Sequence, residues 1–186
     1  MYRNTFLSVM FLACCFNGSL CAQSDAQIYE RTCDAKTYPF SDPSPVATPN
    51  NSYYPYFRFD GFSMQAQEKQ WKMVVLENDY VKLTVTPEIG GKIWGAIDKV
   101  NNKEFVYTNG VVKFRDVAMR GPWTSGGIEF NFGIIGHAPT CSTPIDYLTK
   151  KNVDGSVSCH IFSYEWITRT VWNVEINLPK DKAYFT

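Results

Sequence analysis

The strongest constraint on the fold of this chain is an alternation of apolar and polar residues with a period of two. Residues 81–86 read Val-Lys-Leu-Thr-Val-Thr, and from residue 169 to residue 178 almost every second side chain is apolar. Successive side chains of a β-strand point to opposite faces, so this pattern predicts strands with one buried and one solvated face. We find no stretch with the period of an amphipathic helix. The sequence therefore predicts an all-β protein.

Turn-forming residues separate the alternating segments at intervals of roughly 8–12 residues, a spacing typical of an antiparallel β-sandwich. The pairs Asn101-Asn102 and Asp154-Gly155 suit tight turns between strands. Strands are expected over residues 72–76, 81–86, 92–98, 104–107, 111–114, 156–161 and 169–178, and another is expected to begin at 183–186. Because the chain stops within that last strand, we expect a truncated antiparallel β-sandwich with an open sheet edge.

Composition excludes several classes of protein. Hydrophobic residues make up 45% and aromatic residues 16% of the 186 residues, which is enough for the core of about one domain and unlike a disordered chain. The 18 Lys and Arg residues balance the 18 Asp and Glu residues. Because the charges are balanced and scattered, the sequence offers no basic surface, and we expect no nucleic-acid partner.

The first 22 residues have the pattern of a secretory signal peptide. Arg3 gives a positive start, residues 5–15 form an apolar run, and a small-residue exit ends at Ala22. The run is short for a transmembrane helix, which needs about 20 residues. We expect cleavage after Ala22 and a secreted or periplasmic protein. Lipidation at Cys14 is the alternative, and membrane association is expected only in that case.

Residues 23–70 are expected to form an N-terminal arm rich in proline and aromatic residues. Proline recurs along this segment and disfavours a helix. The arm ends in a group of aromatic residues: Tyr53, Tyr54, Tyr56, Phe57 and Phe59. We expect the arm to be extended and its rings to pack on the body formed by residues 71–186. Stacking of these rings on sugars is the alternative.

Three cysteines remain after the expected cleavage, Cys33, Cys141 and Cys159. An odd number allows at most one internal disulfide, for which Cys141 and Cys159 are the plausible pair; buried free thiols are the alternative. Their spacing fits no zinc site, so we expect no metal. The sequence also contains no dinucleotide-binding or phosphate-binding motif, and we expect no cofactor.

The residues suited to chemistry gather in a segment rich in glycine and proline between residues 115 and 147. Glu129 lies among apolar neighbours and His137 follows eight positions later, so the two are candidates for an acid–base pair. A solvent-facing strand glutamate would look the same in sequence. Arg120, Trp123 and Asn131 are the expected substrate-binding residues, because arginine donates hydrogen bonds to hydroxyls and tryptophan stacks on sugar faces. Core packing is the alternative for Trp123.

Two blocks of sequence resemble a known family. Residues 75–94, which run from Val-Leu-Glu-Asn-Asp-Tyr to Gly-Gly-Lys-Ile-Trp, are similar to the opening of the bacterial family called DUF5107. Residues 120–132, Arg-Gly-Pro-Trp-Thr-Ser-Gly-Gly-Ile-Glu-Phe-Asn-Phe, followed by Gly136 and His137, resemble its most distinctive segment. The chain departs from the pattern at Ala138, where the family commonly has a second histidine.

The resemblance implies a β-supersandwich like that of galactose mutarotase, of which this chain would form the N-terminal portion. Proteins with that fold include sugar epimerases, glycoside hydrolases, polysaccharide lyases and carbohydrate-binding modules, and family members are often followed by tetratricopeptide (TPR) repeats. We therefore expect an exported protein that acts on or binds carbohydrate, as a glycoside hydrolase or an epimerase-like enzyme. A non-catalytic sugar-binding or scaffold module is one alternative. The other is a gene fragment that lacks the C-terminal part of its domain and has no activity alone.

Overall fold

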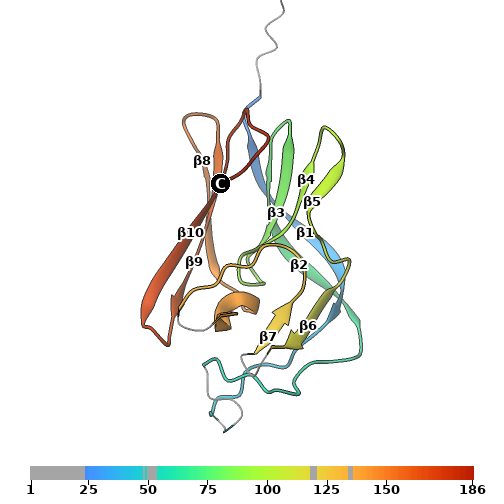
Figure 1. Cartoon of the computed structure of the whole chain (residues 1–186), viewed down its shortest axis with the longest axis vertical. Coiled ribbons are helices and arrows are strands. Elements are labelled where there is room, and N and C mark those ends of the chain that lie inside the picture. The colour runs from blue at the N-terminus through green and yellow to red at the C-terminus, as the bar shows by residue number, and fades with distance from the viewer. Residues whose placement is uncertain (1–23, 48, 50–53, 118–120, 134–135) are drawn as a thin grey trace, which may run out of the picture.

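The computed structural model describes residues 24–47, 49, 54–117, 121–133 and 136–186, and these form two β-sheets that face each other (Figure 1). The strands are β1 (Gln27–Tyr38), β2 (Gln67–Glu77), β3 (Val81–Thr86), β4 (Lys92–Asp98), β5 (Lys103–Val106), β6 (Val112–Asp116), β7 (Pro122–Thr124), β8 (Asp146–Lys151), β9 (Val157–Glu165) and β10 (Thr170–Leu178). A short 3-10 helix, η1 (Pro139–Ser142), precedes β8. The expected all-β sandwich is confirmed.

The large sheet has the strand order β5-β4-β3-β2-β1-β6-β7, and the small sheet has the order β10-β9-β8. Neighbouring strands run antiparallel, as expected, with one exception. β1 and β6 pair in parallel, with Thr37 opposite Val112. Parallel strands need a long connection between them, and here β2 to β5 lie between the two strands in sequence.

The main core fills the space between the two sheets. Leu76, Leu83 and Val85 of the large sheet lie in one cluster with Trp172 and Ile176 of β10. Trp172, Ile176 and Leu178 of β10 are buried and Val174 is half-buried, whereas the odd-numbered residues are more exposed, so the alternation seen in the sequence does mark the inner face. A second apolar cluster lies on the other face of the large sheet, near the ends of β2 and β6; it contains Trp71, Met73, Ile89, Trp94, Val112 and Phe114.

The N-terminal arm is extended, but part of it belongs to the large sheet. β1 pairs with β2 along its whole length, from Gln27 opposite Glu77 to Thr37 opposite Gln67. The boundary expected at residue 70 therefore falls inside β2. Most side chains of β1 are exposed or half-buried on both faces, so the strand lacks the alternation that identifies the others. Beyond β1 the Phe40 and Phe57 rings of the arm lie 5.7 Å apart, and the Tyr54 ring lies 5.7 Å from that of Trp166.

Several details differ from the sequence-based expectations. β7 lies within the glycine- and proline-rich segment 115–147, where no strand was expected, and β8 begins at its end and runs to Lys151. Residues 183–186 form no strand, although the backbones of Asn177 and Thr186 exchange hydrogen bonds of 2.8 and 2.9 Å. Cys141 and Cys159 are buried and free, so the suggested disulfide is absent. The predicted signal peptide, residues 1–22, lies outside the described residues.

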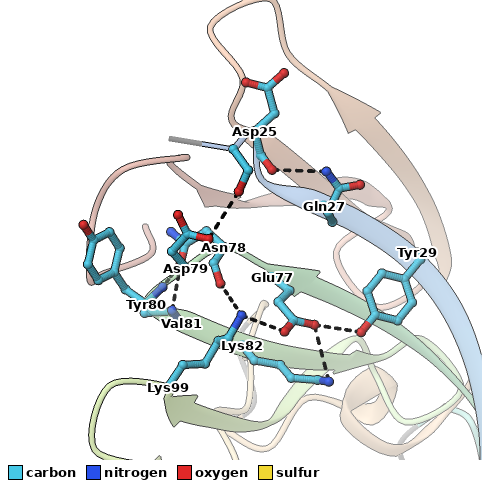
Figure 2. Close-up of polar contacts among 11 residues, drawn as sticks. Asp25, Gln27, Tyr29, Glu77, Asn78, Asp79, Tyr80, Val81, Lys82 and Lys99 are labelled. Atoms are coloured by element: carbon cyan, nitrogen blue, oxygen red, sulfur yellow. Dashed lines mark hydrogen bonds and ion pairs between the residues drawn. The ribbon is translucent and has the colours of Figure 1, made fainter. Parts of the chain in front are cut away.

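The turn between β2 and β3 is held by the buried side chain of Asn78 (Figure 2). Its Oδ1 accepts hydrogen bonds from the backbone N–H groups of Tyr80 and Val81, at 2.8 and 2.7 Å. Its Nδ2 donates to the carbonyl oxygens of Pro179 and Lys182, at 2.7 and 2.8 Å. One side chain therefore ties a turn of the large sheet to the turn that follows β10.

Beside this turn, Glu77 accepts hydrogen bonds from Lys99 and Tyr29 at 2.9 Å each, and Lys82 lies 3.4 Å away (Figure 2). Partial burial raises the pKa of the Glu77 carboxyl, but these bonds and charges outweigh it and lower the pKa overall. The folded protein therefore favours the ionised form of this carboxyl group.

Candidate functional site

Two glycines bring the segment that carries Glu129 against the edge of β4. Gly126 and Gly127 have φ angles of 83° and 69°, in the left-handed region that favours glycine. A Cβ atom on Gly127 would collide with the carbonyl oxygen of Ile93. The next residue, Ile128, exchanges backbone hydrogen bonds of 2.8 and 3.1 Å with Ile93. Glu129 thus follows directly after a point fixed to the large sheet.

The structure brings the side chains of Glu129 and His137 into contact. The Glu129 Oε1 atom lies 2.8 Å from His137 Nδ1. The glutamate side chain is 12% exposed and the histidine side chain 43% exposed, so the histidine is the member of the pair that solvent or a ligand can reach. A neutral imidazole that donates from Nδ1 to the carboxylate keeps a lone pair on Nε2, where it can accept a proton.

The backbone of His137 adopts a conformation that non-glycine residues rarely use. Its φ angle is 56°, in the left-handed region, which costs roughly 1–2 kcal/mol for a residue with a Cβ atom. The neighbouring residue Ala138 donates its backbone N–H to Asn131 Oδ1 at 2.9 Å. Asn131 therefore anchors the backbone beside His137 through its carbonyl oxygen, a role that the sequence did not reveal. Such backbone strain is common at functional sites.

Trp123 lies beside the pair, on β7. Its ring is half-buried and its centroid is 6.0 Å from that of the His137 ring, with the two planes at 75°. Of the expected site residues, the structure therefore brings Glu129, Asn131, His137 and Trp123 into one region. Arg120 lies outside the described residues.

A buried lysine lies beneath Trp123 and was missed by the sequence analysis. Lys92 is 1% exposed, and its Nζ donates to the carbonyl oxygen and the hydroxyl of Thr124, at 2.6 and 3.0 Å. The same Nζ lies 5.8 Å from the centroid of the Trp123 ring. Burial lowers the pKa of Lys92, and the negative charge of Glu129 opposes that shift. The one sequence signal for this burial was the position of Lys92 among the apolar residues Ile89, Ile93 and Trp94.

Cys141 also lies near Glu129, but it is poorly suited to act as a nucleophile. Burial, together with the charge of Glu129, raises the pKa of the Cys141 thiol to about 12. Burial likewise raises the pKa of Cys159 to about 12. Both thiols therefore stay protonated at neutral pH, and a thiol is a much weaker nucleophile than a thiolate.

Three of the surface hollows have volumes of about 340, 470 and 400 Å³. The first lies over the outer face of the large sheet near Trp94, and the second is lined by Trp71 and by residues that follow β1. The third is a cleft between residues 129–132 and residues 171–174 of β10. Of these three, only this cleft is lined by expected site residues, namely Glu129 and Asn131.

The described part of the chain contains no group of three histidine, cysteine, aspartate or glutamate residues placed to hold a metal ion. The same described residues contain no helix long and apolar enough to cross a membrane.

Comparison with known proteins assigns the family. The model of the family described as "Domain of unknown function (DUF5107)" matches residues 48–186. The chain belongs to the DUF5107 family. The matched region contains Trp123, Glu129, Asn131 and His137, so the whole described site lies within the DUF5107 domain.

A similar solved structure is that of a TPR-domain containing protein from Parabacteroides distasonis. The two chains share 27% sequence identity with a TM-score of 0.77. The alignment covers 88% of this chain but only 28% of the P. distasonis chain. This DUF5107 chain therefore spans less than a third of the length of that relative.

Proposed function

We propose that this DUF5107 chain acts on carbohydrate, with His137 as the residue that exchanges a proton with a sugar and Trp123 as the surface on which the sugar ring stacks. The observation that carries the proposal is the 2.8 Å contact between Glu129 Oε1 and His137 Nδ1, made by a largely covered carboxylate to a half-exposed ring. This arrangement orients the imidazole and stabilises the positive charge that forms when Nε2 takes up a proton.

The exposure of the two side chains supports a separate role for each member of the expected acid–base pair. Because the carboxylate is covered and the imidazole is half-exposed, His137 exchanges the proton and Glu129 positions it. A glycoside hydrolase also needs a second carboxylate within roughly 5–10 Å of the first. A single oriented histidine is better suited to proton transfer at a sugar hydroxyl, as in an epimerase-like or mutarotase-like reaction.

The use of sugars as substrates is argued from Trp123 and by analogy with other proteins of this fold. Aromatic rings offer an apolar face to the C–H groups of a pyranose. An exported location, which the leader-like residues 1–22 predict, would bring the protein to extracellular glycans.

A second candidate function is sugar binding without catalysis, favoured by a group of exposed aromatic rings. Trp166 and Tyr164 at the end of β9 have ring centroids 4.9 Å apart, and Tyr54 of the arm lies 5.7 Å from both Trp166 and Tyr56. Trp166 is 61% exposed and Tyr54 is 44% exposed. Solvent-exposed aromatic groups of this kind mark binding surfaces.

The test compares two histidine variants of the full chain. We expect the wild-type protein to accelerate the interconversion of sugar anomers for at least one aldose in a panel, measured by polarimetry. His137→Gln should lower the rate by about 100-fold or more, because it removes the proton-transfer group. His160→Gln is the matched control, since His160 Nε2 also lies near a glutamate, 3.7 Å from Glu175, but on the small sheet.

The His160→Gln variant should keep the wild-type rate within about twofold, because the substitution lies away from the reacting atoms. Equal rates for the two variants, or a folded wild-type protein without turnover, would refute the catalytic role of His137. If the wild-type protein binds a plant or host glycan without turnover and Trp166→Ala abolishes that binding, the second candidate function is supported instead.

A further inference from the structure

The large sheet carries a second pocket on its outer face, away from the small sheet and from the candidate site. This pocket has a volume of about 340 Å³, and each of the strands β1 to β6 contributes at least one residue to its lining. A single pocket that touches six strands shows that the sheet is concave on this side. Small-molecule sites are typically concave and have volumes of about 300–1,000 Å³. The shape and size of the pocket are therefore those of a ligand site.

The floor of this pocket is apolar. Met73, Trp94 and Val112 line it, and all three are buried members of the second apolar cluster. Cys33 and Ala35 of β1 also line the pocket and pack against the same cluster. Covering apolar surface gains roughly 25 cal/mol per Å² removed from water, so this floor favours a ligand with an apolar body.

Arg31 adds a positive charge to this lining. It lies on β1 opposite Met73, and it shares a face of the strand with Cys33 and Ala35, because alternate side chains of a strand point the same way. The residue is exposed, and its guanidinium group makes no hydrogen bond or ion pair with another described residue. A guanidinium group offers a planar fork of N–H donors that matches the two oxygens of a carboxylate. Arg31 is therefore free to bind an anionic group.

The remaining charges of the lining balance one another. Two lysines and two acidic residues line the pocket besides Arg31: Lys36, Lys82, Asp34 and Glu104. Lys82 is also held by Glu77, which lies 3.4 Å from it (Figure 2). The lining therefore has an excess of one positive charge, contributed by Arg31. An anionic group on the ligand complements that charge.

We propose that this pocket binds a small carboxylate with an apolar body. The carboxylate binds the guanidinium group of Arg31, and the apolar body lies on the floor formed by Met73 and Trp94. The residues that line this pocket include neither Glu129 nor His137. The inference therefore concerns a separate site and does not require that the Glu129–His137 pair act on a sugar.

The test titrates benzoate into the isotope-labelled full chain and follows the N–H resonances by NMR. We expect saturable shifts of the Trp94 indole N–H and of the backbone amides of Gly95 and Val112, which line the pocket, with a Kd of about 1 mM. Benzamide is the matched neutral ligand, with the same ring and nearly the same shape. It should bind at least about tenfold more weakly than benzoate, because it cannot form charge-assisted hydrogen bonds with Arg31.

Two arginine variants then locate the binding of the anionic group. Arg31→Gln should weaken benzoate binding at least about tenfold and leave benzamide binding unchanged within about twofold. Arg58→Gln is the matched control, since Arg58 is an exposed arginine of the arm, 3.0 Å from Asp60, and it should bind benzoate like the wild type. Arg31→Lys keeps the charge but loses the planar fork, so its affinity should lie between those of Arg31→Gln and the wild type.

Equal binding of benzoate and benzamide by the wild-type protein would overturn the proposal, and this comparison needs no variant. Equal benzoate binding by Arg31→Gln and Arg58→Gln, or shifts confined to residues outside the pocket, would also overturn it. Glucuronate carries its carboxylate on a polar ring, so tighter binding of glucuronate than of benzoate would show that the apolar floor does not select the ligand and would overturn the proposal too. None of these measurements uses turnover of a sugar, so their failure is distinct from failure of the role proposed for His137.

Discussion

Replacement of Asn78 tests how strongly one buried side chain ties the two sheets together. Asn78→Ala removes four hydrogen bonds, two accepted from backbone N–H groups in the β2–β3 turn and two donated to the turn after β10. The residue is only 4% exposed, so water replaces these bonds poorly. Each hydrogen bond contributes about 0.5–1.5 kcal/mol net, which gives an expected loss of about 3 kcal/mol in the free energy of unfolding.

The matched control is Asn101→Ala in the turn between β4 and β5. Asn101 is exposed and its side chain makes a hydrogen bond of 2.6 Å to Asp98. Water can replace an exposed bond, so this variant should lose about 0.5 kcal/mol or less. Both free energies come from urea denaturation followed by tryptophan fluorescence, with the slope on urea concentration checked for two-state behaviour.

Asn78→Asp refines the test, because it keeps the acceptor oxygen and replaces the donor by a second oxygen. That oxygen would face the carbonyl groups of Pro179 and Lys182, so the ionised variant should be destabilised at neutral pH. Protonation of the introduced carboxyl group restores one donor, and the deficit relative to wild type should shrink on acidification. A loss below about 1 kcal/mol for Asn78→Ala, or a loss equal to that of Asn101→Ala, would refute the reasoning.

Two further predictions concern a charge and a glycine. The pKa of Glu77 is lowered in the folded state, so its contribution to stability is present above the pKa of the unfolded chain, about 4.3, and is lost as the pH falls through the folded value. In Glu77→Gln the unfolding free energy should therefore fall less steeply on acidification than in the wild type. An unchanged dependence on acidic pH would contradict this. Gly127→Ala should cost about 2 kcal/mol or more in chemical denaturation, because Gly127 has φ 69° and an added Cβ meets the Ile93 backbone. Gly110→Ala, where a Cβ meets nothing within 4 Å, is its control and should be close to neutral, and similar losses in the two glycine variants would show that the contact with Ile93 is unimportant.

The sequence predicted the strands with one buried and one solvated face, and the reason lies in β3 and β10. In both strands the inner residues are apolar at every second position, and this local pattern needs no knowledge of the rest of the chain. It failed for β1, because a strand whose side chains are half-exposed on both faces carries no such signal. It also failed for β7, which is only three residues long.

Residue types named some members of the candidate site, and the structure shows which of them lie together. Glu129 and His137 were identified because an acidic residue and a histidine occur in a segment rich in glycine, and the structure joins them at 2.8 Å. The buried Lys92 was read as an ordinary strand residue, since its burial depends on Trp123 and Thr124, which lie about 30 positions later in the chain. The hydrogen bond from the Ala138 backbone to the Asn131 side chain was equally invisible in the sequence.

The sequence by itself determined the class of secondary structure and the chemical nature of the candidate pair, because alternation and side-chain type are local properties of the chain. Only the tertiary structure decided which strands pair, that β6 returns to lie parallel to β1, and that β10 remains at an edge beside Glu129. The physical reason is that strand pairing, burial and the exposure of His137 arise from contacts between residues far apart in sequence. A local sequence pattern does not specify those contacts.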